Sequence, residues 1–273
     1  MNISRNLEKP WVIEVNENIN TLTDNEVKEV IKLIVENMVV VFKNQQLSME
    51  DELRFCKIAG LVQPTQSEKT KHISIAQGIL RVTGKKDEEG KEGLFGHTYA
   101  LDWHANQPSN ESRHPLIWLY GVEGTAGSKT SWLNNIESYN GLPEDFKQRI
   151  NNIEVFCGYK RGSYSDSEYF KEHVNKNNPV KLVQTNKAGK VGLFFPFLQI
   201  FGFKDHSDKE FNEIMDILVE HVLQEKYIYH HEWQDNDIVI SEQWLSIHKR
   251  WEFQDMDKRI LHRIAFDYSN TYN

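Results

Sequence analysis

The chain has 273 residues, 39% hydrophobic and 11% aromatic, which is enough for one domain spanning 1–273 with a sizeable core. Its formal net charge of -8 argues against a nucleic-acid-binding protein, because such proteins usually present a basic face to phosphates. No stretch approaches the ~20 apolar residues of a membrane span, and the N-terminus lacks the apolar core of a signal peptide. Cys56 and Cys157 form no paired motif, so we expect a reduced, cytoplasmic protein.

The N-terminal part, residues 1–65, predicts a helix, a strand and a second helix that pack on a larger β-structure. Thr23 and Glu26 have the spacing of a helix capping box, and apolar residues recur behind them at helical spacing. The β-branched run at 38–42 predicts a buried strand. A second helix follows over 48–60, with a serine as its cap and a glycine at its end.

Beyond residue 70 the pattern changes to short apolar runs separated by Gly, Asn, Asp and Pro. This pattern over 70–268 is typical of a barrel or double-sheet jelly roll. Two helices are inserted, one over 140–150 with Pro143 in its first turn, and one over 207–224 with an apolar stripe. The segment 191–203 is apolar but contains a proline, so it predicts a loop or buried edge that forms core or pocket wall. The expected class is α+β, mainly β.

Two segments contain residues suited to metal and anion chemistry. In WHANQ at 103–107, His104 and Asn106 are two apart at a strand end, so both side chains point to one face and could chelate an ion. The segment SEQWLSIHKRWEFQDMDKRILHRIAF contributes His248, Arg259 and Arg263. The two arginines would share a face of the strand predicted near the end of this segment.

These segments resemble the taurine dioxygenase-like (TauD/TfdA) family of iron(II)- and 2-oxoglutarate-dependent oxygenases, and the resemblance runs from Trp11 to Phe266. VVVFKNQQLSMEDELRFCKIAG is similar to the strand, turn and helix that precede the family's jelly roll. WHANQ occupies the place of the W-H-x-D motif, SEQWLSIHKR that of D-N-x-x-x-x-H-x-R, and KRILHR that of the closing R-x-x-x-R. The resemblance implies a clavaminate synthase-like double-stranded β-helix.

The resemblance also implies roles for individual residues. His104, Asn106 and His248 occupy the three metal-ligand positions. Thr130, in KTSWLNNIESYNGLP, and Arg259 occupy the positions that bind 2-oxoglutarate. The physical chemistry agrees, because two imidazoles with one further ligand leave open positions on iron(II), and a guanidinium matches a carboxylate in geometry and charge.

Three further positions complete the expected site. Arg263 occupies the position often used for an anionic substrate group, and His72 is a candidate substrate contact from the strand before the site. Asp102 lies two residues before His104, so its carboxylate could contact the metal or hydrogen-bond a ligand. The alternative for Asp102 is an exposed aspartate at a strand end.

Asn106 is the departure that divides the functional interpretations, because the family has Asp or Glu at this position. A neutral amide removes one negative charge from the metal site. Asn106 could ligate through its oxygen in a hydroxylase. It could instead leave a position for chloride, as in the halogenases of this superfamily, which have a smaller apolar residue there. A protein that binds small acids without catalysis is the third alternative.

The sequence therefore predicts an oxygenase that uses Fe(II), 2-oxoglutarate and O₂ on an unactivated C–H bond of a small anionic molecule, amino-acid-like or a sulfonate. Hydroxylation is the default outcome. The apolar stripe over 207–224 leaves a homo-oligomer open, and neither a nucleic acid nor a membrane is an expected partner.

Overall fold

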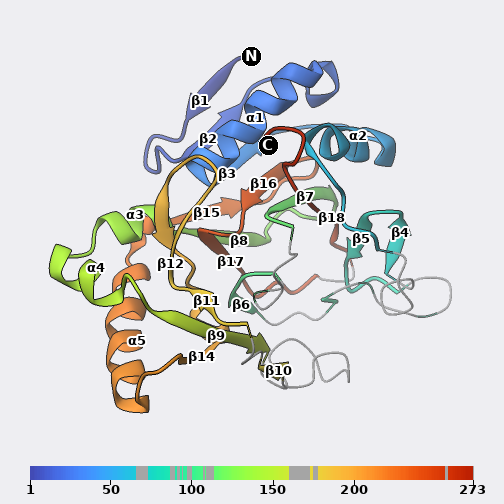
Figure 1. Cartoon of the computed structure of the whole chain (residues 1–273). Coiled ribbons are helices and arrows are strands. Elements are labelled where there is room, and N and C mark those ends of the chain that lie inside the picture. Colours follow the sequence, from blue (N-terminus) through green and yellow to red (C-terminus); the bar gives the residue numbers. More distant parts are fainter. Residues whose placement is uncertain are drawn as a thin grey trace.

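Two β-sheets form the centre of the structure, a computed structural model that describes residues 1–65, 73–86, 90, 93, 95–96, 100–106, 108, 114–159, 173–174, 178–255 and 258–272 (Figure 1). The larger sheet has the strand order β1 (Ile3–Arg5), β2 (Val12–Val15), β3 (Val39–Phe42), β16 (Ile238–Glu242), β7 (Leu116–Glu123), β18 (Ile260–Phe266), β5 (Ile79–Val82) and β4 (Ser74–Ala76). The smaller has the order β15 (Ile228–Glu232), β8 (Lys129–Asn134), β17 (Ser246–Arg250) and β6 (Leu101–His104). Neighbouring strands are antiparallel except β2 and β3, as in the predicted double-stranded β-helix.

The other strands and the helices surround these sheets. The helices are α1 (Asp24–Asn37), α2 (Met49–Ala59), α3 (Asn135–Asn140), α4 (Glu144–Ile150) and α5 (Asp208–Val222), with 3-10 turns η1 (Ile19–Thr21), η3 (Phe197–Gln199) and η4 (Glu225–Tyr227). The remaining strands are β9 (Glu154–Tyr159), β10 (His173–Val174), β11 (Val180–Lys181), β12 (Val183–Thr185), β13 (Val191–Leu193) and β14 (Ile200–Phe203). Among the described residues, no helix has the length and apolar composition needed to cross a membrane.

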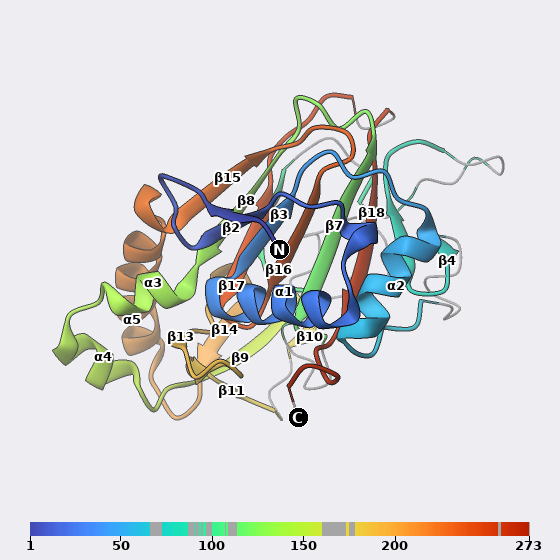
Figure 2. The same cartoon turned by 90° about the horizontal axis from the view of Figure 1, so that it is seen from above.

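Helices α1 and α2 cover the outer face of the larger sheet, as the view from above shows (Figure 2). Strand β3 contributes side chains to two hydrophobic clusters, because successive side chains of a strand point to opposite faces of the sheet. Val40 and Phe42 pack under the two helices, whereas Val39 and Val41 pack between the sheets. The all-apolar β3 run is therefore buried on both faces, as predicted.

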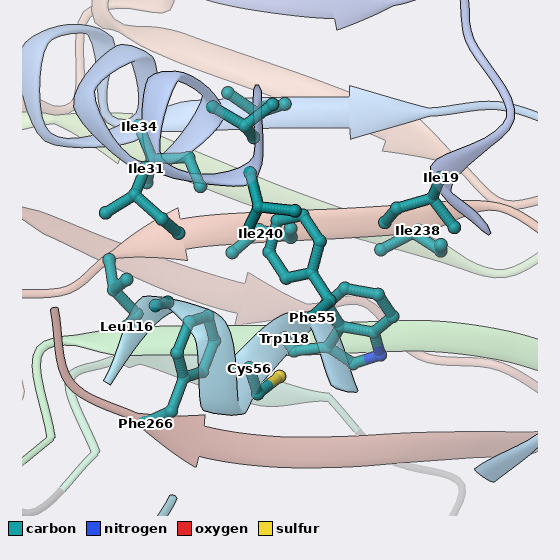
Figure 3. Close-up of a cluster of buried hydrophobic side chains, with 14 of the residues drawn as sticks. Ile19, Ile31, Ile34, Phe55, Cys56, Leu116, Trp118, Ile238, Ile240 and Phe266 are labelled. Carbon is teal, nitrogen blue, oxygen red and sulfur yellow. The ribbon is translucent and has the colours of Figure 1, made fainter. Parts of the chain in front are cut away.

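The outer core cluster contains side chains of α1, α2 and the larger sheet that are almost completely buried (Figure 3). Ile31 and Ile34 of α1 lie above Ile240, and Phe55 of α2 is tilted against Trp118 at a centroid distance of 5.4 Å. Each such side chain contributes about 1.5–3 kcal/mol by its transfer out of water. A second cluster, around β9, β14 and α5, contains Cys157, while the outer cluster contains Cys56.

A buried carboxylate connects α2 to the larger sheet. Glu52 has no exposed surface and accepts a hydrogen bond from Nε1 of Trp118 at 3.0 Å. Its other oxygen lies 2.7 Å from Nδ1 of His262 on β18. Because a buried carboxylate is costly without partners, these two contacts fix where α2 sits on the sheet.

The helix predicted behind the Thr23 cap and those predicted at 48–60 and 207–224 are confirmed, and α1, α2 and α5 each begin with a capping box. The prediction of helix, strand and helix for the N-terminal part was incomplete. Strands β1 and β2 precede α1, and β1 is exposed along its whole length, so no apolar alternation identified it.

Two other predictions need correction. The helix predicted at 140–150 is shorter, because α4 begins only at Glu144 and Pro143 is the residue before it. The preceding helix α3, which ends at Asn140, was not predicted. The segment 191–203 is mostly buried, as predicted, although Val191 and Leu198 are exposed, and it contains β13, η3 and β14. The strand predicted near the end of the C-terminal segment, at KRILHRIAF, begins two residues later than expected, because β18 starts at Ile260 and Arg259 precedes it.

Candidate active site

A cavity lies between the two sheets. Its described lining residues come from both sheets and from the segments beside them: Val82, Phe95, Leu101, His104, Asn106, Ile117, Leu119, Thr130, His248, Arg250, Arg259, Leu261 and Arg263. Apart from Asp102, all the predicted site residues that the structure describes are in this set. His72 lies outside the described residues.

His104 and His248 face each other across neighbouring strands. Their Cα atoms are register partners in the β6–β17 pair, and their ring centroids are 4.2 Å apart. Nδ1 of His104 lies 2.6 Å from the backbone oxygen of Asp102. A carbonyl oxygen can only accept, so Nδ1 carries the proton and Nε2 keeps a lone pair.

Burial keeps both imidazoles neutral. Burial is the main cause that lowers the pKa of His104 to about 4, and the Asp102 carbonyl opposes the shift. Burial, together with His104 and Arg263, also holds the pKa of His248 well below its ordinary value. Neutral imidazoles are the form that binds a divalent metal.

Two buried glutamines hold the backbone around Asn106. The N–H of Asn106 donates to Oε1 of Gln243 at 3.0 Å, and the N–H of Ala105 donates to Oε1 of Gln199 at 2.8 Å. The side-chain Nδ2 of Asn106 is buried and has no hydrogen-bond partner within the described part of the chain. Because the two amide atoms of an asparagine exchange by a rotation, this end of the side chain can present an oxygen to a metal.

The carboxylate of Asp102 points away from the cavity. Its side chain is 57% exposed, and Oδ1 lies 3.1 Å from Nζ of Lys249. The exposed-aspartate alternative therefore describes Asp102, while its backbone carbonyl orients His104. The described residues contain no group of three His, Cys, Asp or Glu side chains arranged to hold a metal, so the donors gathered here are two imidazoles and one amide.

Arg259 brings a buried positive charge to the cavity. The side chain is 2% exposed, Nε donates to Oγ of Ser128 at 3.0 Å, and Nη1 has no partner among the described residues. Burial, with a smaller effect of Arg250, lowers the pKa of Arg259 to about 9, so the guanidinium stays charged at neutral pH. A buried cation with an unused donor fits an incoming carboxylate.

Thr130 is also buried and lines the same cavity. Its hydroxyl oxygen accepts a hydrogen bond from Nε1 of Trp233 at 2.9 Å, so the hydroxyl hydrogen remains available to a ligand oxygen. Together with Arg259, this hydroxyl fits the distal carboxylate of a dicarboxylic acid.

Arg263 and Arg250 add two more positive charges. Arg263 lies on β18 opposite Leu119, and Arg250 follows His248 on β17. Nη1 of Arg250 donates to the backbone oxygen of Phe95 at 2.8 Å, which fixes an aromatic wall of the cavity. None of the described lining residues is Asp or Glu.

The sequence did not reveal several residues that hold this site together. Gln199, Gln243, Ser128 and Trp233 each contact a predicted site residue or its neighbour, and Arg250 lines the cavity itself. Gln243 and Arg250 lie within the SEQWLSIHKR motif, so the sequence contained a signal for these two residues. Gln199 was the one polar residue in an otherwise apolar stretch, and Ser128 and Trp233 carried no local signal.

The fold and the site define an enzyme of the jelly-roll oxygenase class, with donors for a divalent metal and for a carboxylate in one cavity. The model of the "Taurine catabolism dioxygenase TauD, TfdA family" matches residues 4–265, so the chain belongs to this family. The chain is thus a dioxygenase of the 2-oxoglutarate-dependent kind.

Curated relatives are similar at low identity. The alpha-ketoglutarate-dependent 2,4-dichlorophenoxyacetate dioxygenase of Burkholderia sp. (strain RASC) is 22% identical over 89% of this chain and 86% of its own. Pentalenolactone F synthase of Streptomyces avermitilis is also 22% identical, over 90% of this chain and 86% of its own.

Solved structures agree on the fold. AAD-2 in complex with Mn(II) and N-oxalylglycine has a TM-score of 0.79 at 19% identity, with 98% of both chains covered. A taurine dioxygenase from Burkholderia xenovorans has a TM-score of 0.72 at 15% identity, covering 93% of this chain and 85% of the other.

Proposed function

We propose that this chain oxidises an unactivated C–H bond of a small anionic substrate, with hydroxylation as the outcome. The main support for this proposal is the content of one cavity. It contains two neutral imidazoles, the Asn106 amide and the buried Nη1 of Arg259, which has no partner among the described residues. His104, His248 and Asn106 would hold iron(II), and Arg259 and Thr130 would hold the distal carboxylate of 2-oxoglutarate. The bound iron and 2-oxoglutarate supply the oxidising chemistry through oxidative decarboxylation of the 2-oxo acid.

The residues of the chain bind, orient and exclude water. The Asp102 carbonyl fixes the tautomer of His104, and Gln243 and Gln199 fix the backbone that carries Asn106. Burial of Arg259 in a region of low dielectric strengthens its attraction for a carboxylate.

The walls of the cavity support a substrate with an apolar body and one anionic group. Leu119, Leu261 and Phe95 provide apolar surface, and Arg263 provides a positive charge beside it. Two relatives are named for 2,4-dichlorophenoxyacetate, an aromatic carboxylate, which fits this description. Amino-acid-like and sulfonate substrates remain within the proposed class.

Halogenation is the second candidate, and the uncharged Asn106 favours it. With no carboxylate among the described lining residues, a chloride ion would supply the negative charge that the usual ligand provides. A binding protein without catalysis is the competing class. The single domain, the cytoplasmic location and a homo-oligomer stay predictions.

The test is anaerobic titration of the metal-free protein with Fe(II) and 2-oxoglutarate, following the visible charge-transfer band of the chelate, with and without chloride. Hydroxylation predicts a chloride-independent band, and the formation of succinate above an enzyme-free control once O₂ and a substrate acid are present. A band that strengthens with chloride supports halogenation. If no band and no succinate form at any iron concentration, the oxygenase proposal fails.

Two variants connect the titration to the assigned residues. His248→Ala is expected to abolish metal binding, whereas Arg259→Leu is expected to weaken 2-oxoglutarate binding far more than iron binding. An unchanged affinity for 2-oxoglutarate in Arg259→Leu contradicts the anchor role of this arginine.

A further inference from the structure

The turn between β7 and β8 approaches the backbone next to Arg259 very closely. Gly124 has φ +62, and a Cβ atom there would lie 2.3 Å from the backbone oxygen of Lys258. A side chain at position 124 would therefore be strained and would collide with the segment that carries Arg259. This close approach brings Ser128, at the end of the turn, to the guanidinium.

A directed chain of hydrogen bonds runs from Arg259 into this turn. Nε of Arg259 donates to Oγ of Ser128 at 3.0 Å, and that hydroxyl donates to the backbone oxygen of Thr125 at 2.7 Å. Because Ser128 donates its hydroxyl hydrogen to Thr125, the lone pairs of that hydroxyl oxygen face Arg259. Thr125 is itself fixed, since its N–H and its hydroxyl both donate to Oδ1 of Asp235 at 2.7 Å.

This arrangement fixes the orientation of the guanidinium before any ligand arrives. Ser128 is 1% exposed and Thr125 is fully buried, so water does not compete for these bonds. With Nε occupied, the Nη end of Arg259 is the part open to a ligand, and Nη1 has no partner among the described residues. An arginine fixed in this way loses less conformational entropy on binding than a mobile one.

Resting on the proposed role of Arg259, we propose that Ser128 is a positioning residue that makes the site select 2-oxo acids with a distal carboxylate. It does so by holding Arg259 in the orientation that receives this carboxylate. Ser128 is not among the described residues that line the cavity, so its removal should weaken the binding of the distal carboxylate only.

The matched probes are 2-oxoglutarate and 2-oxopentanoate, which have the same chain length but differ in the distal group, carboxylate or methyl. Affinities are measured by calorimetry on the Mn(II)-loaded protein, so no turnover interferes. In Ser128→Ala the preference for 2-oxoglutarate over 2-oxopentanoate should fall roughly 10-fold, the loss expected for one buried hydrogen bond to a charged group. The affinity for 2-oxopentanoate should stay unchanged.

Ser131→Ala is the control, because Ser131 lies three residues further along the chain on β8, is fully buried and accepts a hydrogen bond from Nε1 of Trp251, which does not line the cavity. It should leave the preference unchanged. If Ser128→Ala does not fold, Ser128→Cys keeps the shape of the side chain with a slightly larger and weaker acceptor and gives the same readout.

Arg259→Leu distinguishes a failure of the Ser128 proposal from a failure of the proposed function. If the preference falls in Arg259→Leu but not in the Ser128 variant, the positioning role of Ser128 is overturned and the proposed function stands. If Arg259→Leu also leaves the preference unchanged, the anchor assignment in the proposed function fails as well.

Discussion

The indole nitrogen of Trp233 donates a hydrogen bond to Oγ1 of Thr130 at 2.9 Å. Trp233 is completely buried, and its ring packs edge-on against His231 at a centroid distance of 4.6 Å. The other side of the His231 ring meets two polar groups, because the Tyr229 hydroxyl lies 3.1 Å from Nδ1 and Oδ2 of Asp237 lies 3.2 Å from Nε2. The direction of the Thr130 hydroxyl thus depends on a buried layer behind the cavity wall.

Trp233→Phe should therefore weaken 2-oxoglutarate binding about 5- to 10-fold, since it removes the donor to Thr130. Equilibrium titration of the Mn(II)-loaded protein measures this. Trp132→Phe is the control, because it removes a similar volume from a buried indole whose Nε1 has no hydrogen-bond partner in the described residues. Equal losses in both variants would mean that packing, and not the hydrogen bond, orients Thr130.

Asn106→Asp should raise the affinity for Mn(II) by roughly 10-fold or more and remove any dependence on chloride, because it restores an anionic ligand. Calorimetry with and without chloride measures both effects. Asn106→Ala provides the comparison. If the amide oxygen ligates the metal, the alanine variant binds Mn(II) more weakly than the wild type. Equal affinities would show that Asn106 is not a ligand.

The metal-free protein should lose stability as the pH falls from about 6.5 to about 4. The unfolded chain binds a proton on His104 below pH 6.5, whereas burial lowers the folded pKa of His104 to about 4. The unfolded state thus binds more protons in this window, and unfolding becomes easier by about 1.4 kcal/mol per pH unit for this histidine. The pKa of His248 is lowered in the same direction.

Urea unfolding at several pH values between 7.5 and 4.5 tests this slope. In His104→Gln the slope should be shallower than in the wild type by about 1.4 kcal/mol per pH unit. Parallel slopes in the two proteins would mean that the folded protein protonates His104 as easily as the unfolded chain does.

Glu52→Ala should destabilise the protein by about 2–4 kcal/mol, because the buried donors of Trp118 and His262 lose their acceptor. Chemical denaturation measures the loss. The affinity for Mn(II) should not change, because Glu52 does not line the cavity. Glu50→Ala, an exposed position on the same helix, is expected to shift stability by no more than about 0.5 kcal/mol. If Glu52→Ala costs no more stability than Glu50→Ala, Glu52 does not fix the position of α2 on the sheet.

Local signals account for the parts of the fold that the sequence predicted. The Thr23 and Glu26 capping box and the β-branched run of β3 need no distant contact, and both are present. The candidate site was accessible because the resemblance to the family's motifs identified His104, Asn106 and His248, which the fold then brings into one cavity.

The missing parts depend on contacts between distant residues. Ser128 and Arg259 are 131 positions apart, and Gln199 reaches the backbone of Ala105 across 94 positions. No local pattern distinguishes a serine that holds an arginine from a serine in any other turn. Strand β1 was missed for a related reason, because only its pairing with β2 defines it.

The two cysteines lie in separate core clusters, Cys56 in the outer one and Cys157 in the one around β9. Burial raises the pKa of the Cys56 thiol well above its usual value, and only a thiolate reacts with an alkylating or disulfide reagent. Modification of either thiol therefore requires that its own cluster opens. Thiol labelling under mild denaturant, resolved by peptide, would report the opening of each cluster separately. Equal labelling rates would mean that the chain opens as one cooperative unit. Faster labelling at Cys157 would mean that the layer around β9 and α5 opens first.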